Sequence, residues 1–547
     1  MRFLPVSLNA LLVELADLDQ TLALLASLQR DPLHGVAELV PAARTILVHY
    51  RPWATTASAL VRAIASRDLS QRVERSNTLI EIPVRYDGED LAEVAQWLGI
   101  TPAEVVRRHT GSEYTVAFTG FAPGFAYLSG GHPSLDVPRR RTPRTQIPAG
   151  AVGLAGTFSG VYPKASPGGW QIIGTTPVPM WDLGREQPAL LQPGYRVRFV
   201  DMAAVDGGFD TPIGTAGSRP DGAGSGAVPA VDPHGQPGRA ASSAALKVRC
   251  TGLLTVFQDP GRHGQAGQGV SASGALDQAA LRTANRLVGN RSDSAALETV
   301  GGGLQLQSQG DTVLAVTGAQ APLTLRTADG RQWNVPTHQA VALADGDTLS
   351  LGQPVAGARC YIAARGGFAV APVLGSCATD TLAGIGPAPL AVGDVLGVLP
   401  APAGAVVGMP EQPAADLPTV DRDVVLDVVL GPRTDWFTPK SVARLAGQRW
   451  RVTPQSNRVG LRLAGEVPLE RAITGELPSE GTVLGALQVP PSGQPILFLA
   501  DHPLTGGYPV IGAVAPYHLD RAGQIPVGAW LRFNLVGPFE ALQPSAD

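Results

Sequence analysis

Short apolar segments separated by glycine and proline run along most of this chain of 547 residues. The segments 45–50 (TILVHY) and 78–86 (TLIEIPVRY) are rich in β-branched and aromatic residues, which is typical of β-strands. Leucines recur at helical spacing over 18–25, which predicts a small α/β domain at the N-terminus. Together these patterns predict a mainly β fold with α+β parts, built from β-barrel or sandwich domains.

Two longer helices have recognisable ends. We expect a helix over 101–109, because Thr101 can cap its first turn and Glu104 is placed to close a capping box. A second helix is predicted over about 275–288 (ALDQAALRTANRLV), where Gly289 would end it. The helical content is therefore expected to be small.

One stretch differs in composition from the rest of the chain, because it is rich in Gly, Pro and Ala and has few large apolar residues. Such a stretch cannot bury enough apolar surface to order itself, so we expect a flexible linker between an N-module and a C-module. The expected domains are an α/β subdomain of the N-module (1–78), a barrel domain of the N-module (79–203), the linker (204–245) and a C-module of two β-barrel-like halves (246–547).

Internal repeats suggest that the two modules contain related β domains. SGVYP at 159–163 and PLTGGYP at 503–509 share a small-Gly-x-Tyr-Pro turn after an apolar stretch that contains Pro and Gly. Four further segments each have an apolar residue, a turn ending in Gly and then a strand: 191–199, 343–351, 390–398 and 525–533. Any β-barrel uses such turns, so these four alone do not establish a duplication. The tyrosine loops predict two related barrels that each present the same loop.

Composition argues against several classes of protein. A formal net charge of −4 provides no large basic surface for a nucleic-acid backbone. The three cysteines are far apart, as expected for reduced thiols in a cytoplasmic protein. The apolar N-terminal stretch carries acidic residues, unlike a secretory signal, and no apolar run is long enough to span a membrane.

Common nucleotide, hydrolase and metal motifs are absent from the sequence. There is no P-loop, no strand–GxGxxG–helix, no GxSxG and no HExxH or His/Cys cluster, so no metal site is expected. None of the four methionines is followed by lysine, so we expect no covalently attached biotin.

Arginines and glycines of the N-module indicate an anion site. The segment VPRRRTPRTQIPAG holds Arg139 and Arg144 among prolines that stiffen it, and guanidinium groups suit carboxylate or phosphate. The segment SPGGWQIIG offers the amides of Gly168 and Gly169 as an anion nest. An arginine run is equally often a solvated surface, and both interpretations stay open.

Charged residues of the C-module cluster in three segments. Asp259 and Arg262 share the turn QDPGR, and Arg458 and Arg462 would share one face if their segment is a strand. Asp501 stands beside the TGGYP loop, where a turn-stabilising role and a catalytic role are both open. These residue types indicate binding of a small anionic molecule, with acid–base chemistry.

Long motifs in both modules resemble known families. GFAPGFAYLSG, PRRRTPRTQIPAG and SGVYPKASPGGWQIIG resemble the B-type subunits of 5-oxoprolinase, a family also described as allophanate hydrolase subunit 1 or the Kip-inhibitor family. GLLTVFQDPGRHGQAGQG, SNRVGLRLAG and ADHPLTGGYPVIGAV resemble the C-type subunits of 5-oxoprolinase, a biotin-dependent carboxyltransferase-like family. The chain thus looks like a fusion of the two.

The resemblance implies cyclophilin-like β-barrel domains in both modules with an active cleft between them. It implies an ATP-dependent opening of 5-oxoproline to glutamate with a separate A-type subunit, using ATP and Mg²⁺ and a small amide or carboxylate substrate. Two alternatives are a carboxyltransferase of the urea carboxylase type, with biotin on another chain, and a regulator that inhibits a sensor kinase. A homo-oligomer is compatible with each.

The resemblance also implies site residues. Four are expected to be catalytic: Asp501, Glu480, Arg458 and Asp259. The expected substrate- and nucleotide-binding residues are Arg139, Arg144, Tyr162, Gly168, Gly169, Arg262, Asp277, Gln488, Thr505, Gly506, Gly507 and Tyr508. The sequence departs from the family pattern at Pro503, where Gln is usual, and at Val459, where Met is usual.

Overall fold

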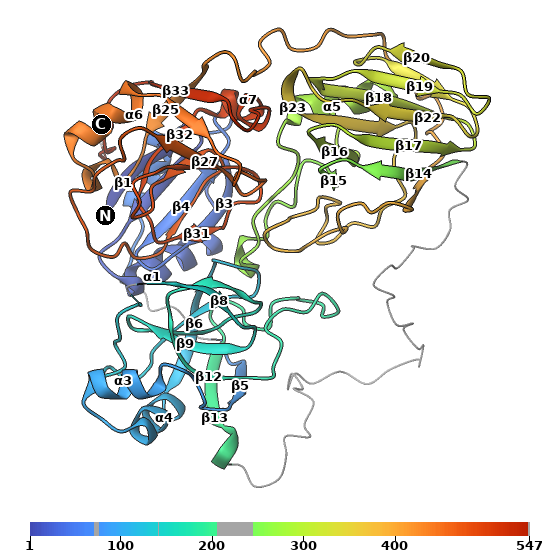
Figure 1. The fold of residues 1–547 in the computed structure, drawn as a ribbon. Helices are drawn as coiled ribbons and strands as arrows, with labels where there is room; N and C mark the ends of the chain where they lie inside the picture. The colour runs from blue at the N-terminus through green and yellow to red at the C-terminus, as the bar shows by residue number, and fades with distance from the viewer. Residues whose placement is uncertain (71–75, 141, 205–243, 545–547) are drawn as a thin grey trace.

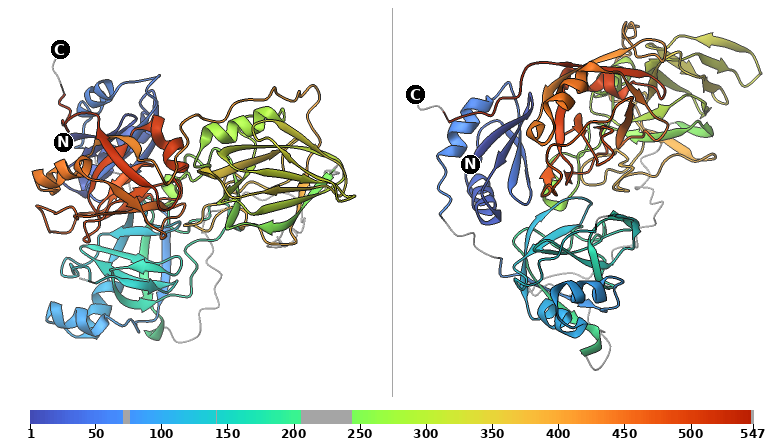
Figure 2. Two further views of the ribbon diagram at one scale, coloured as in Figure 1. Left: turned by 45° about the horizontal axis from the view of Figure 1, so that its top comes forward. Right: turned by 60° about the vertical axis from the view of Figure 1, so that its left-hand side comes forward.

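The computed structural model describes residues 1–70, 76–140, 142–204 and 244–544. It is mainly β, as the sequence pattern predicted. Figures 1 and 2 show four parts, which we call the N-terminal domain (1–70), the first barrel (79–201), the two-sheet domain (244–398) and the second barrel (424–535). Nearly all of the expected linker lies outside the described residues, since a short 3₁₀ turn ends at Ala204 and β14 begins at Ala244.

The N-terminal domain is a four-stranded antiparallel sheet in the order β1-β2-β4-β3, covered by two helices. Its elements are β1 (Arg2–Ser7), β2 (Ala10–Glu14), α1 (Leu18–Arg30), β3 (Val36–Pro41), β4 (Thr45–Tyr50) and α2 (Ala57–Ala65). Asp17 caps α1 by accepting a hydrogen bond from the Gln20 amide at 2.9 Å. The apolar face of α1, including Leu24 and Leu28, packs on the sheet, which is why leucines recur at helical spacing there.

The N-terminal domain bridges both barrels. Leu4 and Leu12 on one face of its sheet share an apolar cluster with Phe498 of the second barrel. Ala42 of the N-terminal domain and Phe118 of the first barrel share another apolar cluster, which joins these two domains. Figure 1 shows the blue N-terminal sheet beside the orange and red strands of the second barrel. In packing, therefore, this domain does not belong to the N-module alone.

The two barrels share one topology. From the first strand onward, the order is β5-β13-β6-β7-β10-β9-β12 in the first barrel and β25-β33-β26-β27-β30-β29-β32 in the second. In each, the first and last strands pair in parallel. The second barrel closes through β25 and β32, and the first through a bridge between Arg85 and Thr175. Each also carries a two-stranded ribbon, β8 with β11 and β28 with β31. This correspondence confirms that the modules contain related β domains.

The bounds of the two barrels are as follows. The first contains β5 (Leu79–Val84), α3 (Leu91–Leu98), α4 (Pro102–Thr110), β6 (Glu113–Thr119), β7 (Ala126–Ser129), β8 (Arg144–Ile147), β9 (Ala151–Ala155), β10 (Phe158–Val161), β11 (Ser166–Gly168), β12 (Gln171–Thr175) and β13 (Arg196–Asp201). The second contains β25 (Val424–Leu430), α6 (Pro439–Gly447), β26 (Trp450–Val452), β27 (Gly460–Gly465), β28 (Glu480–Gly481), β29 (Ala486–Gln488), β30 (Ile496–Phe498), β31 (Thr505–Gly506), β32 (Val510–Val514), α7 (Leu519–Gly523) and β33 (Trp530–Leu535).

The tyrosine loops are not equivalent, which corrects the prediction of one repeated loop. Tyr162 lies between β10 and β11, whereas Tyr508 lies between β31 and β32. The segment that matches LTGGYPVIG in the topology is SPGGWQIIG. Its Gly174 approaches the first strand of its barrel as Gly512 does, since a Cβ at either would lie 2.8 Å from a valine methyl of that strand. The Tyr-Pro pair therefore occurs in two turns that are not equivalent. Gly174 and Gly512 are equivalent, because at each a strand passes close to the first strand of its barrel.

The turns before strands agree better with prediction. All four have a glycine with φ between 83° and 99°, and in each the strand begins two residues later: Gly194, Gly346, Gly393 and Gly528. Only the first and last of these turns precede equivalent strands, β13 and β33. The other two belong to the two-sheet domain, where the same kind of turn leads into strands that have no counterpart in the barrels.

The two-sheet domain has a six-stranded sheet, β20-β19-β22-β17-β14-β24, and a five-stranded sheet, β15-β16-β23-β18-β21. Its elements are β14 (Ala244–Thr251), β15 (Leu254–Gln258), α5 (Gln278–Leu287), β16 (Ala296–Val300), β17 (Leu304–Gln309), β18 (Thr312–Gln320), β19 (Leu323–Arg326), β20 (Gln332–Val335), β21 (Ala340–Leu343), β22 (Thr348–Leu351), β23 (Ala356–Ala364) and β24 (Val395–Val398). It is a pair of packed sheets, and its core includes Cys360, one of three free cysteines.

The predicted helices are present. Thr101 caps α4 by accepting from the Glu104 amide at 3.2 Å, but the Glu104 carboxylate pairs with Arg107 at 2.7 Å, so only half of the capping box forms. Helix α5 starts later than predicted, after Asp277. Among the described helices, none is long and apolar enough to cross a bilayer.

Candidate functional site

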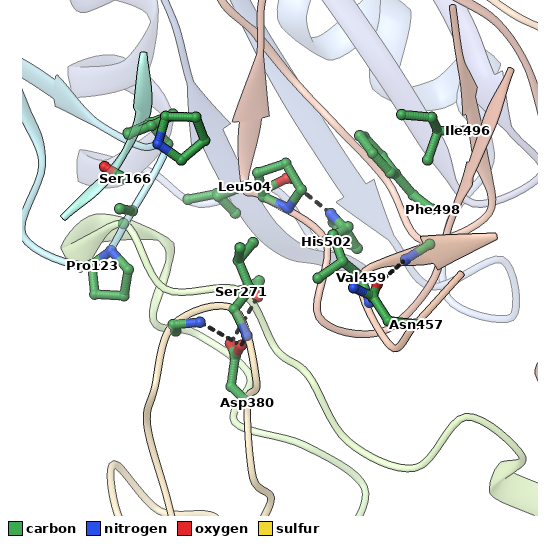
Figure 3. Close-up of a pocket in the computed structure, with 18 of the residues that line it drawn as sticks. Pro123, Ser166, Ser271, Asp380, Asn457, Val459, Ile496, Phe498, His502 and Leu504 are labelled. Atoms are coloured by element: carbon green, nitrogen blue, oxygen red, sulfur yellow. Dashed lines mark hydrogen bonds between the residues drawn. The ribbon is translucent and has the colours of Figure 1, made fainter. Parts of the chain in front are cut away.

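A cavity of about 200 Å³ lies where the first barrel, the two-sheet domain and the second barrel meet (Figure 3). Each part contributes one charged side chain to its lining: Lys164, Asp380 and Arg462, respectively. Apolar side chains from the first and second barrels, including Phe121 and Phe498, form much of the remaining wall. The cavity therefore exists only when all three parts are in place.

Backbone contacts between domains hold the first-barrel wall of the cavity. The Phe121 amide donates to Thr505 Oγ1 at 3.0 Å, and the Gly124 amide donates to the Gln268 carbonyl at 3.0 Å. Phe121 has φ of 65°, a left-handed conformation that is unusual for a bulky residue. Such a residue persists where its surroundings impose it, which is common at binding sites.

Asp380 is the one carboxylate in the cavity lining, and it is almost fully buried. Its Oδ1 accepts from the amides of Leu382 and Ala383 at 2.9 and 2.8 Å, and its Oδ2 accepts from Ser271 Oγ at 3.3 Å. Burial and the nearby Asp501 charge raise the pKa of Asp380 to about 6. A carboxyl group with such a pKa can exchange protons near neutral pH.

Two cations face the same cavity from different domains. The Lys164 ammonium donates to the Leu382 carbonyl; burial lowers its pKa, while the Asp380 charge opposes that shift. The Arg462 guanidinium is exposed and, among the described residues, has no hydrogen-bond or ion-pair partner. His502 also lines the cavity, and burial lowers its pKa, which favours the neutral imidazole.

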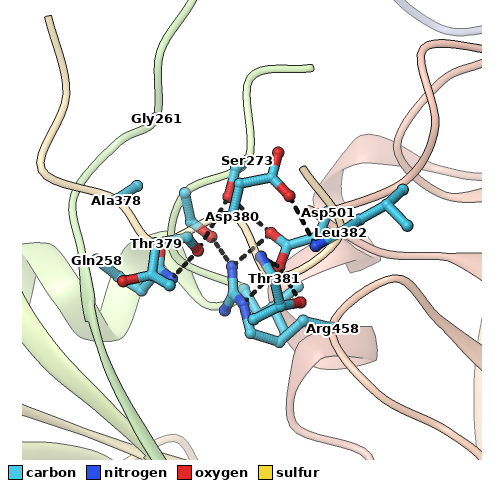
Figure 4. A network of polar contacts seen from close by, with 12 residues as sticks. Gln258, Gly261, Ser273, Ala378, Thr379, Asp380, Thr381, Leu382, Arg458 and Asp501 are labelled. Carbon is cyan, nitrogen blue, oxygen red and sulfur yellow. Dashed lines mark hydrogen bonds and ion pairs between the residues drawn. The ribbon is translucent and has the colours of Figure 1, made fainter. Parts of the chain in front are cut away.

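A buried ion cluster lies beside Asp380 and Leu382 of the cavity lining (Figure 4). Arg458 pairs with Asp501 through Nε and Nη2, both at 3.0 Å, and its Nη1 contacts Glu298 of β16. Asp501 also accepts from Ser273 Oγ at 2.6 Å and from the Thr381 amide at 2.8 Å. Burial alone would raise the pKa of Asp501, but the Arg458 guanidinium holds it below its usual range.

The ion cluster joins domains. Asp501 is fully buried and Arg458 is 2% exposed, and their partners lie in the two-sheet domain. With five donors directed at its two oxygens, the Asp501 carboxylate is already saturated. This geometry suits an interdomain clamp that positions the cavity wall.

The remaining expected catalytic residues also have structural partners. Glu480 pairs with Arg433, which also contacts Glu14 of the N-terminal domain at 3.0 Å. Burial raises the pKa of Glu480 even with that partner. Asp259 accepts from Ser376 Oγ at 2.6 Å and from two backbone amides, so it anchors a turn.

Arg262 and Asp277 lie deeper in the two-sheet domain. The Arg262 Nη2 donates to the Ala378 carbonyl, while its Nε and Nη1 have no hydrogen-bond partner within the described residues. Burial lowers the pKa of Arg262, opposed by Asp380 and other nearby carboxylates. Asp277 caps α5 through the Ala280 amide at 2.8 Å, and burial raises its pKa to about 6.

The expected arginines of the first barrel divide into two kinds. Arg144 makes a bidentate pair with the buried Asp90 at 2.8 Å, and Arg140 adds a bond to the same carboxylate at 2.7 Å. Arg139 has no such partner in the described part of the chain. Its Nη1 would lie 3.1 Å from a Cβ at Gly507, so Arg139 sits against the glycine loop of the second barrel.

Two of the expected loop residues, Tyr162 and Gly507, lie near Arg139. Tyr162 is buried, and burial raises its pKa, partly offset by the Arg139 charge. A Cβ at Gly168 would lie 2.3 Å from the Tyr162 hydroxyl, whereas Gly169 has more room. In the second barrel, Thr505 accepts from the Phe121 amide, Gly506 pairs with Glu480, and the Tyr508 carbonyl accepts from Gln488 Nε2 at 3.4 Å. Gln488 contacts Gly506 and also lines the cavity.

Comparison with known proteins places these features in a family. A family model for the carboxyltransferase domain, subdomain C and D, matches residues 1–191, and one for subdomain A and B matches 268–535. The 5-oxoprolinase C subunit of Escherichia coli (strain K12) is 37% identical over 305 residues, which covers 55% of this chain and 94% of that protein. The 5-oxoprolinase B subunit of Escherichia coli O157:H7 is 44% identical over 170 residues, covering 30% and 78%. This chain belongs to the family of 5-oxoprolinase B and C subunits. It joins both kinds in one polypeptide.

Solved structures extend this family likeness to the whole fold. The crystal structure of TTHA0988 has a TM-score of 0.78 and 34% identity, covering 96% of this chain and 99% of that one.

Urea amidolyase of Saccharomyces cerevisiae is 32% identical over 311 residues, but the match spans only 16% of that longer protein.

Of the residues expected from the 5-oxoprolinase family, only Gln488 lines the cavity itself. The departures from the family pattern, Val459 and Pro503, both line it. Sequence reasoning missed Lys164 and Asp380 as site residues. Asp380 follows a Gly-Ser-Cys-Ala-Thr turn with no recognised motif, so only the fold shows that it reaches the junction.

Proposed function

We propose that this chain is the joined B–C component of an ATP-dependent 5-oxoprolinase, which opens the lactam of 5-oxoproline to L-glutamate together with an A-type subunit. In that reaction a water oxygen bonds to the lactam carbonyl carbon, the C–N bond breaks and the nitrogen becomes the amino group of glutamate, while ATP and a second water are converted to ADP and phosphate. The observation that supports this best is a cavity built jointly by the B-like and C-like parts of one chain.

The size of the cavity favours a small substrate. At about 200 Å³ it is smaller than the roughly 300–1,000 Å³ typical of pockets for drug-sized ligands. It therefore suits a single-ring metabolite better than a nucleotide. We place ATP and its Mg²⁺ outside this cavity, at the contact with the A-type subunit, and the reaction in the cytoplasm, where ATP is available.

Asp380 is our candidate for proton transfer in the cavity. It lies within the lining, two backbone amides fix one of its oxygens, and the other has only one long contact. Arg458 and Asp501 then act as positioning residues, because their polar groups are directed at each other and at the neighbouring domain. Negative charge that develops on the substrate oxygen would be stabilised by the cavity cations and amides.

The test is reconstitution with an A-type 5-oxoprolinase subunit and measurement of ATP-dependent glutamate release. We expect release with the wild-type chain, and a loss of roughly 100-fold or more in kcat for Asp380→Asn, as for removal of an acid–base group. Asp329→Asn, which changes an exposed aspartate of the two-sheet domain, is the matched control and should retain activity. No release with both proteins folded would contradict the proposal.

A second candidate function is carboxyl transfer, because both matching family models describe a carboxyltransferase domain. The chain lacks a Met-Lys pair, so biotin would have to come on another chain. Urea-dependent transfer of the carboxyl group from carboxybiotin to a nitrogen of urea, in the absence of any glutamate release, would favour this candidate over 5-oxoprolinase.

A further inference from the structure

The charges that line the cavity are unbalanced. Lys164 and Arg462 supply two positive charges, Asp380 supplies at most one negative charge, and burial favours the neutral form of His502. A ligand with a single negative charge would balance the lining. A neutral ligand such as urea would leave one positive charge unbalanced, and a dianion would leave one negative charge unbalanced.

The two cations differ in their availability to a ligand. The Lys164 ammonium already donates to the Leu382 carbonyl and lies in the field of Asp380, so its charge is largely committed within the protein. The Arg462 guanidinium has no partner among the described residues, and Arg462 is exposed and belongs to the cavity lining. A guanidinium can bind both oxygens of a carboxylate, which an ammonium cannot.

The surroundings of Arg462 are suited to a carboxylate attached to a hydrocarbon ring. Arg462 lies on β27 directly opposite Ile496 of β30. Figure 3 shows Val459, Ile496 and Phe498 together on the side of the cavity away from Pro123 and Ser166. Ring methylene groups could pack on these side chains while the carboxylate reaches the guanidinium.

From these observations we propose that Arg462 is the specificity-determining residue of the cavity and binds the carboxylate of a small monocarboxylate. Asp380 and Lys164 then face the amide end of the same molecule. This inference rests on the proposed function, because the carboxylate that it assigns to Arg462 is that of 5-oxoproline.

The test compares two probes of similar size and shape, 5-oxoproline and its carboxamide, 5-oxoprolinamide, in which a neutral amide replaces the carboxylate. Binding to the full chain is measured by calorimetry for wild type, Arg462→Met, Arg462→Lys and the control Arg451→Met, which changes an exposed arginine of the adjacent strand β26. Circular dichroism verifies that each variant is folded.

We expect Arg462→Met to weaken 5-oxoproline binding roughly 10- to 100-fold, the range for a charge-assisted hydrogen-bonded pair. Arg462→Lys should lose part of that affinity, because lysine keeps the positive charge but cannot bind both carboxylate oxygens at once. Carboxamide binding should be the same in all variants, and Arg451→Met should match wild type for both probes. Equal loss for both probes, no loss for either, or no binding of 5-oxoproline to the folded wild-type chain would overturn the inference.

The design separates this inference from the proposed function. If reconstituted enzyme releases glutamate but Arg462→Met leaves KM for 5-oxoproline unchanged, the inference is wrong and the proposed function stands. If no glutamate is released but binding depends on the carboxylate and on Arg462, the carboxylate site stands and the proposed hydrolysis at that site is wrong.

Discussion

Removing Arg458 should break the clamp beside the cavity. The substitution Arg458→Met leaves Asp501 and Glu298 buried without their shared cation. Loss of one partner from a buried ion pair typically costs about 3–5 kcal/mol, because the remaining charge is left uncompensated. We expect a free energy of unfolding lower by that amount for the segments that meet there.

The pH dependence of this loss has a definite sign. In the wild-type protein the pKa of Asp501 is lowered, so its pairing adds stability above its unfolded pKa of about 3.9, and this is lost as pH falls through the lower folded value. Without Arg458, burial should raise the pKa of Asp501, so protonation relieves the penalty. The stability gap between wild type and Arg458→Met should therefore shrink as pH falls from about 7 to 5.

Hydrogen exchange with mass spectrometry is the suitable assay, since several domains can unfold separately and a single unfolding midpoint would mix them. Peptides that contain Ser273 and Asp501 should lose protection in Arg458→Met, while those from the N-terminal domain helices should not. Arg282→Met, an exposed position on α5, is the control. A gap below about 1 kcal/mol, or one that widens as pH falls, would refute the clamp.

Two further predictions concern single positions. Asp277→Asn should become more stable relative to wild type as pH rises from 4 to 7, by at most about 3 kcal/mol. The raised pKa of about 6 means that ionisation of Asp277 over this range is increasingly unfavourable in the folded wild-type protein. Urea titrations at both pH values test the sign. Gly168→Ala should lower the melting temperature of the first barrel, because the added Cβ would lie 2.3 Å from the Tyr162 hydroxyl. Gly169→Ala should not lower it, because the added Cβ would lie 3.7 Å from its nearest neighbour. Differential scanning calorimetry would contradict this if the two variants behaved alike.

Local chemistry was predictable from the sequence. Thr101 caps α4 as predicted, because capping depends on residues within one turn. The turn before β33 was also predicted, since glycine at Gly528 meets a local requirement for positive φ. Such features need no knowledge of distant segments.

The candidate site was less predictable, because its residues meet only through the fold. Arg458 and Arg462 were expected to share a face, but β27 begins at Gly460, so Arg458 precedes the strand and enters the ion cluster. Arg462 remains in the strand and reaches the cavity. Asp380 gains its raised pKa from burial and from Asp501, which lies 121 positions later in the chain.

The buried ion pairs explain how a site with walls from three domains keeps its shape. Two of the buried charged clusters cross a domain boundary: Arg458 reaches Glu298 of the two-sheet domain, and Arg433 reaches Glu14 of the N-terminal domain. Apolar contacts alone tolerate sliding, whereas a buried charge is stable only against its partner, so such pairs fix relative position more than they add stability. We infer that the duplicated barrels provide the cavity walls, and that the ion pairs set the register in which those walls face one another.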